Sequence, residues 1–156
     1  MSIPERLQTR GFSLVEVLVA IVVLSIAVTG VLLVYTNTAR GSAEALINKQ
    51  ALAIAEAMLE EIQLAAYANP AGGFAGPGSS INDRDEYDDV SDYNGFSTTG
   101  VYKIDGTQVL TDYNVSVTVA VSAFQGIAES KLITVTVTHP SSGRSVVLTG
   151  YRINYP

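Results

Sequence analysis

The chain has 156 residues, which leaves room for one domain with a modest core, and its formal net charge is −6. Such an acidic chain lacks the basic stripe that nucleic-acid-binding proteins use, so we expect no nucleic-acid partner. It contains no cysteine, which excludes disulfides, thiolate nucleophiles and cysteine-ligated metals.

The first predicted element is an apolar run from Phe12 to Tyr35, in which Glu16 is the only charged side chain. A helix of this length, at about 1.5 Å per residue, can span the ~30 Å hydrocarbon core of a bilayer. Arg6 and Arg10 precede the run. The positive-inside rule therefore predicts a cytoplasmic N-terminus, with the rest of the chain across the membrane.

Three interpretations of this run compete. A secretory signal peptide fits poorly, because the run exceeds an apolar region of ~7–15 residues and no small-residue cleavage site closes it. A simple membrane anchor leaves Glu16 unexplained, unless its carboxylate reaches back to the headgroups. The third interpretation is a cut after Gly11, which would make Phe12 the new N-terminus, about one helical turn from Glu16. The free amine of one chain and Glu16 of a staggered neighbour would then pair and set the register between them.

The stretch RGFSLVEVLVAI, residues 10–21, resembles the class III signal of type IV pilins and type II secretion pseudopilins. The resemblance implies that a prepilin peptidase cleaves after Gly11 and methylates Phe12, and that Glu16 serves assembly with other pilin subunits. It also implies a single-pass subunit of the inner membrane, with a periplasmic C-terminal domain, that is later built into an extracellular filament. Many major pilins carry a proline where this chain has Leu33, so this helix has no built-in break there.

A helical pattern continues beyond Tyr35, but its apolar residues now form one stripe. The stripe consists of Ile47, Ala51, Ile54, Ala55, Met58, Ile62 and Ala65. We predict one helix from about Phe12 to Ala66, following a leader at residues 1–11 that is removed. Its membrane and assembly half covers residues 12–35 and its amphipathic half residues 36–68, whose stripe needs a covering layer.

Residues 69–98 are predicted to form a loop that is first rich in glycine and proline and then acidic. Clustered carboxylates suit Ca²⁺, although their spacing is not that of an EF-hand. Two alternatives remain open, a solvated and mobile loop or a Ca²⁺ site. The candidate ligands are Asp83, Asp85, Asp88, Asp89 and Asp92.

Within this loop, the stretch DDVSDYNGF, residues 88–96, resembles a D-D-V-x-D-Y-x-G stretch of minor pilins of the mannose-sensitive haemagglutinin (MSHA) type. The resemblance implies a minor pilin that enters a pilus or primes its assembly, with cell adhesion as a related role. The alternatives are a type II secretion pseudopilin and a membrane-anchored periplasmic module that binds Ca²⁺ or an adhesive target. Apart from any family, we expect Tyr93 and Phe96 to pin the loop to a sheet and Asn94-Gly95 to form a turn.

Residues 99–156 change to a period of two, which predicts half-buried strands around Tyr113–Val121, Ile133–Val137 and Val146–Asn154. Asp105-Gly106 indicates a hairpin turn between two further short strands, 101–104 and 107–110. The predicted fold is α+β, with a long N-terminal helix packed on a four- or five-stranded antiparallel sheet. It resembles the architecture of type IV pilins.

The sequence gives little support for catalysis. His139 is the only histidine and lies in His-Pro-Ser-Ser-Gly, which reads as a turn. The chain carries neither a phosphate-binding glycine loop nor a G-x-S-x-G nucleophile motif. We therefore expect a structural or binding protein, not an enzyme.

Overall fold

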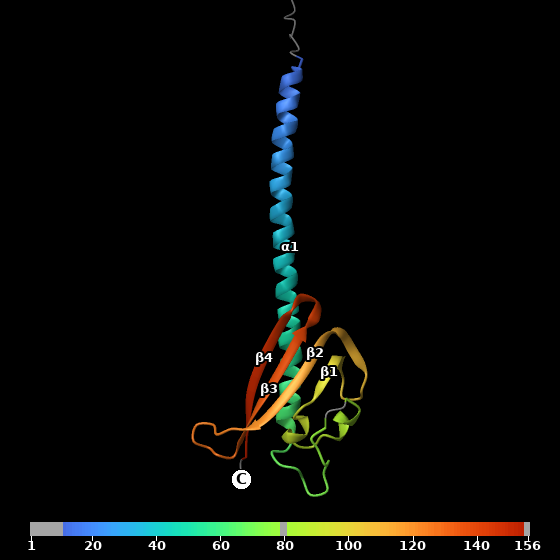
Figure 1. The fold of residues 1–156 in the computed structure, drawn as a ribbon, viewed down its shortest axis with the longest axis vertical. Helices are drawn as coiled ribbons and strands as arrows, with labels where there is room; N and C mark the ends of the chain where they lie inside the picture. Colours follow the sequence, from blue (N-terminus) through green and yellow to red (C-terminus); the bar gives the residue numbers. More distant parts are fainter. Residues whose placement is uncertain (1–10, 79–80, 155–156) are drawn as a thin grey trace, which may run out of the picture. The chain divides into compact units, whose positions relative to one another are not determined.

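The computed structural model describes residues 11–78 and 81–154, and its first element is the helix α1 (Leu14–Leu64), shown in Figure 1. The predicted limits, Phe12 and Ala66, are correct to within two residues. The chain has no proline between Pro4 and Pro70, so nothing removes a backbone donor along this length. The leader residues 1–10, with Arg6 and Arg10, lie outside the described residues.

The chain divides into two compact units, Met1–Ala43 and Glu44–Pro156. In the first unit α1 is exposed on all sides, and it runs without a break past Gly30 and Leu33. Hydroxyl groups in this apolar stretch donate to carbonyls of their own helix, as in the bond of 2.7 Å from Ser25 Oγ to the Ile21 carbonyl. In the described part of the chain, α1 is the one helix long and apolar enough to cross a membrane.

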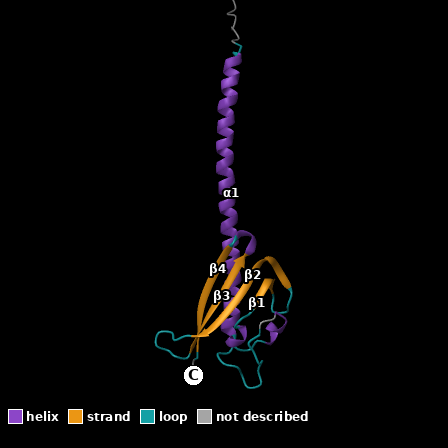
Figure 2. Cartoon of the chain, in the orientation of Figure 1, coloured by secondary structure: helices purple, strands orange, loops and turns teal. Residues whose placement is uncertain are grey.

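In the second unit, four antiparallel strands form one sheet with the order β1-β2-β3-β4 (Figure 2). The strands are β1 (Ser97–Tyr102), β2 (Gln108–Val121), β3 (Ser130–His139) and β4 (Arg144–Ile153). The segments 107–110 and 113–121, expected as separate strands, fall mostly within the single long strand β2. The predicted α+β fold, a helix on a small antiparallel sheet, is confirmed.

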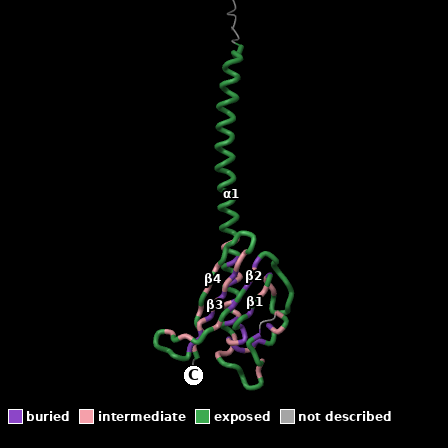
Figure 3. Tube along the Cα trace, viewed as in Figure 1, coloured by how far each residue is buried: buried purple, intermediate pink, exposed green. Residues whose placement is uncertain are grey.

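The core of the second unit lies between the sheet and the C-terminal half of α1 (Figure 3). Alternate residues of the two central strands are buried, because successive strand side chains point to opposite faces. Burial of each large apolar side chain contributes about 1.5–3 kcal/mol. The buried apolar residues of α1 and of the two central strands are Ala51, Ala55, Met58, Ile62, Tyr113, Val115, Val117, Ile133, Val135 and Val137. The stripe predicted for the helix is therefore its core face.

Three short 3₁₀ helices complete the described chain: η1 (Ile81–Glu86), η2 (Val90–Tyr93) and η3 (Pro140–Ser142). The predicted turn at His139 is η3, and Nδ1 of His139 accepts a hydrogen bond of 3.2 Å from the Ser142 backbone N–H. The His139 ring lies edge-to-face against Tyr113 at a centroid distance of 4.9 Å. The single histidine thus has a structural place in the β3–β4 connection.

Candidate functional site

The predicted processing site lies just before α1. Gly11 and Phe12 are exposed and non-helical, and the side chain of Phe12 is 80% exposed. Glu16 lies in the first turn of the helix, where the unpaired N–H groups and the helix dipole favour a carboxylate. Among the described residues, none forms an ion pair or hydrogen bond with the Glu16 carboxylate. The predicted processing junction and Glu16 therefore lie at the same end of α1.

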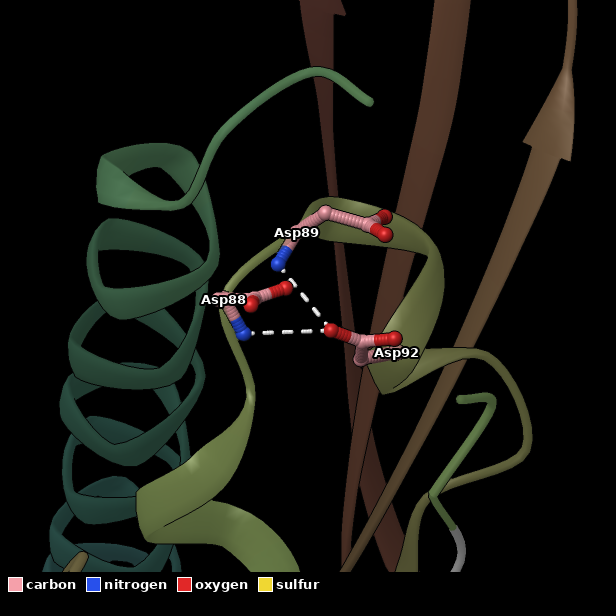
Figure 4. Close-up of side chains that lie close together, drawn as sticks. All are labelled: Asp88, Asp89 and Asp92. Atoms are coloured by element: carbon pink, nitrogen blue, oxygen red, sulfur yellow. Dashed lines mark hydrogen bonds between the residues drawn. The ribbon is translucent and has the colours of Figure 1, made fainter. Parts of the chain in front are cut away.

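The acidic segment, residues 81–96, is folded around the 3₁₀ helix η2. Asp92 Oδ2 accepts backbone N–H bonds from Asp88 at 3.1 Å and from Asp89 at 3.0 Å, as Figure 4 shows. Asp89 in turn accepts a hydrogen bond from the backbone N–H of Ser91. This reciprocal arrangement is a capping box, which satisfies the unpaired donors at the start of the turn.

Aromatic and aliphatic side chains fix the acidic segment to the core. Val90 and Phe96 are almost completely buried, and Tyr93 is only 2% exposed. The Tyr87 ring meets Tyr93 edge-to-face at a centroid distance of 5.0 Å, a favoured geometry for aromatic pairs. The prediction that Tyr93 and Phe96 pin this segment is confirmed.

The turn predicted at Asn94-Gly95 is also confirmed. Gly95 has a φ of +88°, a backbone conformation that suits glycine. Its N–H donates to the Val117 carbonyl at 3.1 Å, and Oδ1 of Asn94 accepts a bond of 2.9 Å from the Val119 N–H. The stretch DDVSDYNGF thus caps η2 with its aspartates, buries three of its apolar residues and joins β2 through its turn.

A partly buried ion pair ties the same segment to α1. Arg84 donates from Nε to Glu61 Oε1 at 2.8 Å, and a second bond joins its Nη2 to Glu61 Oε2. Arg84 Nη1 donates to the Tyr102 carbonyl at 2.9 Å, and the Tyr93 hydroxyl donates to Glu61 at 3.1 Å. Arg84 is only 7% exposed. The alternative of a solvated loop is therefore wrong for Arg84, Asp89 and Asp92, which are buried, whereas Asp85 and Glu86 are exposed.

Lys131 of β3 forms a second anchor that the sequence pattern did not reveal. Its side chain is nearly buried, and Nζ donates to Ser91 Oγ at 2.6 Å and to the Tyr67 carbonyl. It also lies 3.8 Å from Asp89 Oδ1. A buried ammonium group has lost most of its contact with water, so it needs polar or charged partners. Here these partners link β3 to η2 and to the chain after α1.

Burial and negative neighbours raise the pKa of two tyrosines around this segment. Burial, with smaller contributions from the charges of Asp83 and Asp92, raises the pKa of Tyr87 to about 12. Burial first, and then the Glu61 carboxylate, raises the pKa of Tyr93 well above its ordinary value. Both phenols therefore stay protonated at neutral pH and do not act as bases there.

The glycine-rich loop before residue 79 lies directly against the acidic segment. A Cβ atom added to Gly73 would lie 2.2 Å from Asp88 Oδ2, and one added to Gly76 would lie 2.0 Å from Asp92 Oδ1. The backbone also bonds here, since the Phe74 N–H donates to Asp88 Oδ2 at 2.9 Å. A side chain at either glycine would force the facing aspartate to move, so the close approach of the two segments depends on these glycines.

Of the five aspartates proposed as Ca²⁺ ligands, the structure brings together Asp88, Asp89 and Asp92. Each offers an oxygen within 4.8 Å of the others, whereas Asp83 and Asp85, on η1, are not in this group. Within the described chain, Asp88 Oδ1 is buried without a hydrogen-bond partner. Asp89 and Asp92 already accept hydrogen bonds from backbone N–H groups. Carboxylate oxygens are suitable Ca²⁺ ligands. Ca²⁺ binding by these three aspartates stays a prediction.

Comparison with known protein families gives a match at the N-terminus of the chain. Residues 6–32 match the family model of the prokaryotic N-terminal methylation motif. The matched stretch contains Gly11, Phe12 and Glu16 and continues into the apolar half of α1. No curated protein and no solved structure matched the chain.

Proposed function

We propose that this chain is a minor subunit of a type IV pilus, because its N-terminus carries the matched methylation motif. The match supports a type IV pilin-like or pseudopilin-like protein that is processed by prepilin peptidase, and it suggests a structural, non-enzymatic subunit. The proposal rests on one arrangement of residues. The Gly11-Phe12 junction is exposed, Glu16 lies in the first turn of the helix that follows, and this helix continues without a break to Leu64.

The first step is cleavage in the inner membrane. Gly11 and Phe12 precede the helix, so a protease can bind this bond in an extended conformation without unwinding α1. Cleavage removes residues 1–11, and methylation then modifies the new amine of Phe12. In this state the apolar part of α1 holds the chain in the membrane, with a cytoplasmic N-terminus and a periplasmic C-terminal domain.

The second step is assembly. A carboxylate in an apolar medium is costly without a partner, and Glu16 has none among the described residues. A neighbouring chain supplies one in the form of its Phe12 amine. Pairing of these groups sets the stagger between adjacent α1 helices, so Glu16 acts as a register residue. The subunit then leaves the inner membrane and becomes part of the extracellular filament.

The finer assignment is a minor pilin of the MSHA type, most like MSHA pilin protein D. Its support is the stretch at residues 88–96, in which the aspartates, buried rings and turn each have a structural place. Such a subunit enters the filament or primes its assembly, and it contributes to adhesion. A type II secretion pseudopilin shares the N-terminal motif, and recovery of the chain from sheared surface pili would distinguish the two.

Two substitutions in a host that has the peptidase and the pilus test the proposal. We expect Gly11→Ala to leave the leader attached, and Glu16→Ala to be cleaved normally yet reach the sheared pilus fraction at least tenfold less. The control is Glu56→Ala, which removes an exposed carboxylate from the same helix. Normal cleavage of Gly11→Ala would refute the processing step, and equal assembly of Glu16→Ala and Glu56→Ala would refute the register role.

A second candidate property is Ca²⁺ binding at Asp88, Asp89 and Asp92, favoured by their convergence and by the unpaired oxygen of Asp88. Calorimetric titration of the full chain in detergent with Ca²⁺ tests it. We expect heat of binding that Asp88→Asn abolishes and that Asp85→Asn, outside the group, leaves unchanged. Absence of heat at millimolar Ca²⁺ would end this candidate.

A further inference from the structure

An open cavity of about 370 Å³ lies between the second half of α1 and the β1–β2 hairpin. This volume is within the range of sites that bind ligands or side chains. Its walls are mainly apolar or small and include Ala53, Ala57, Val101, Val109 and Leu110. Insertion of an apolar group into such a cavity is favourable, because it removes apolar surface from water.

The local backbone keeps this cavity open. On the helix side, Ala53 and Ala57 are too small to fill it. On the sheet side, the pairing of β1 with β2 is irregular around Val101, and Gly100 has a φ of +100°. A Cβ atom on Gly100 would lie 2.2 Å from the Gln108 side-chain nitrogen. The irregular strand and the two alanines therefore create the opening together.

A matching apolar projection lies in the β2–β3 hairpin, residues 121–129, which we call the apolar tip. Val121, the last residue of β2, is 79% exposed, and Ile127 is 40% exposed. They flank the polar pair Gln125-Gly126 at the end of the connection. Two backbone bonds between Phe124 and Ile127, of 3.1 and 2.8 Å, close the turn at its end. The Phe124 ring packs on Tyr151 at a centroid distance of 4.4 Å. The tip is thus held in shape before it meets any partner, which lowers the cost of binding.

The apolar tip cannot fill the cavity of its own chain. The β1–β2 and β2–β3 connections lie at opposite ends of β2 (Figure 1). Even from Val115, the cavity residue of β2 that is nearest to the tip along the strand, six residue steps lead to Val121, and these span roughly 20 Å. A tip from a second copy can reach the cavity. Complementary surfaces at two different places on one chain produce a head-to-tail contact, which continues into an open array.

We propose that the cavity receives the apolar tip of a second copy of this chain. The charges agree, because Lys103 lines the cavity beside the mutually paired Glu61 and Arg84. Glu129, whose carboxylate accepts a bond of 2.8 Å from the Asn154 side chain, is the one charged residue of the tip. The inference rests on the proposed function, since it names a contact between globular domains that would repeat along a filament. It is separate from the pairing of Phe12 with Glu16 and involves only residues of the second unit.

Disulfide cross-linking tests the contact directly, because the chain has no cysteine of its own. The test chain carries Val109→Cys and Ile127→Cys together. The control chain carries Thr118→Cys and Ile127→Cys, with Thr118 exposed on a different part of β2. Both full chains are oxidised in sheared pili and, separately, in detergent at high concentration, and are then separated on non-reducing gels.

We expect the test pair to give a ladder of dimers, trimers and longer species, at least tenfold above the control. Adding Ala57→Leu, which narrows the cavity from an exposed helix position, should remove most of the ladder while the circular dichroism spectrum stays the same. A ladder no stronger than the control, or a single dimer band, would overturn the proposed contact. Failure of the proposed function can be told apart from failure of the contact. If the chain is not a pilus subunit, it will be absent from the sheared pili, while the sample in detergent still shows whether the contact forms.

Discussion

Replacing Arg84 with methionine removes the charged group that ties the acidic segment to α1. In the folded chain this guanidinium pairs with Glu61 through two bonds and also donates to the Tyr102 carbonyl. Methionine keeps much of the packing volume but leaves the Glu61 carboxylate without its cation. We therefore expect a loss of stability with no change in the fold.

The expected loss follows from how far the pair is buried. Breaking a buried ion pair costs about 3–5 kcal/mol, because the remaining charge stays desolvated. The side chain of Glu61 is 24% exposed, so water can reach it and we expect about 3 kcal/mol, the lower end. Replacing both residues, as Arg84→Met with Glu61→Leu, removes the stranded charge. The cost should then fall to about 1–2 kcal/mol, mainly for the lost partner of the Tyr93 hydroxyl.

The assay is urea unfolding of the full chain in detergent, followed by near-ultraviolet circular dichroism of the tyrosines. The matched control is Arg144→Met. Arg144 pairs with Glu44, and their side chains are 43% and 52% exposed, so its loss should cost less than about 1 kcal/mol. Equal unfolding free energies for Arg84→Met and Arg144→Met would refute the structural role of the buried pair.

Three further changes test the packing around the acidic segment. Gly76→Ala places a Cβ 2.0 Å from Asp92 Oδ1 and should lower the unfolding free energy by about 1–3 kcal/mol; an unchanged urea midpoint would contradict it. The pKa of Tyr87 is about 12 in the folded chain and about 10 in the unfolded chain. The contribution of the protonated phenol to the free energy of unfolding is therefore complete below pH 10 and is lost as the pH rises towards 12. Unfolding measured across this range should show the decline, and Tyr87→Phe should reduce it. Lys131→Met leaves a buried carboxylate unpaired and should destabilise the chain far more than Lys49→Met at an exposed position, as compared by thermal unfolding.

The elements that the sequence predicted well are those encoded by local pattern. An uninterrupted run of apolar and helix-favouring residues located α1 to within two residues at each end. Alternation around Tyr113 and Ile133 located the central strands and their buried faces. Such patterns need no knowledge of distant residues, because each is a property of neighbouring positions.

The acidic segment shows what local pattern misses. A run of carboxylates indicates solvent exposure when it is read alone, yet Asp89 and Asp92 are buried. Their environment depends on Lys131, and that of Arg84 on Glu61, which lie far away along the chain. The sequence likewise predicted a glycine-rich loop without indicating that it packs against these aspartates. Pairings of this kind are set by the tertiary fold and not by spacing.

Intact-mass spectrometry of the chain from sheared pili tests the central claim most directly. We predict a single species that begins at Phe12, lacks residues 1–11 and carries one added methyl group at its N-terminus. A filament-associated chain that retains the leader, or a chain that stays uncleaved in the membrane of a host with an active prepilin peptidase, would contradict it.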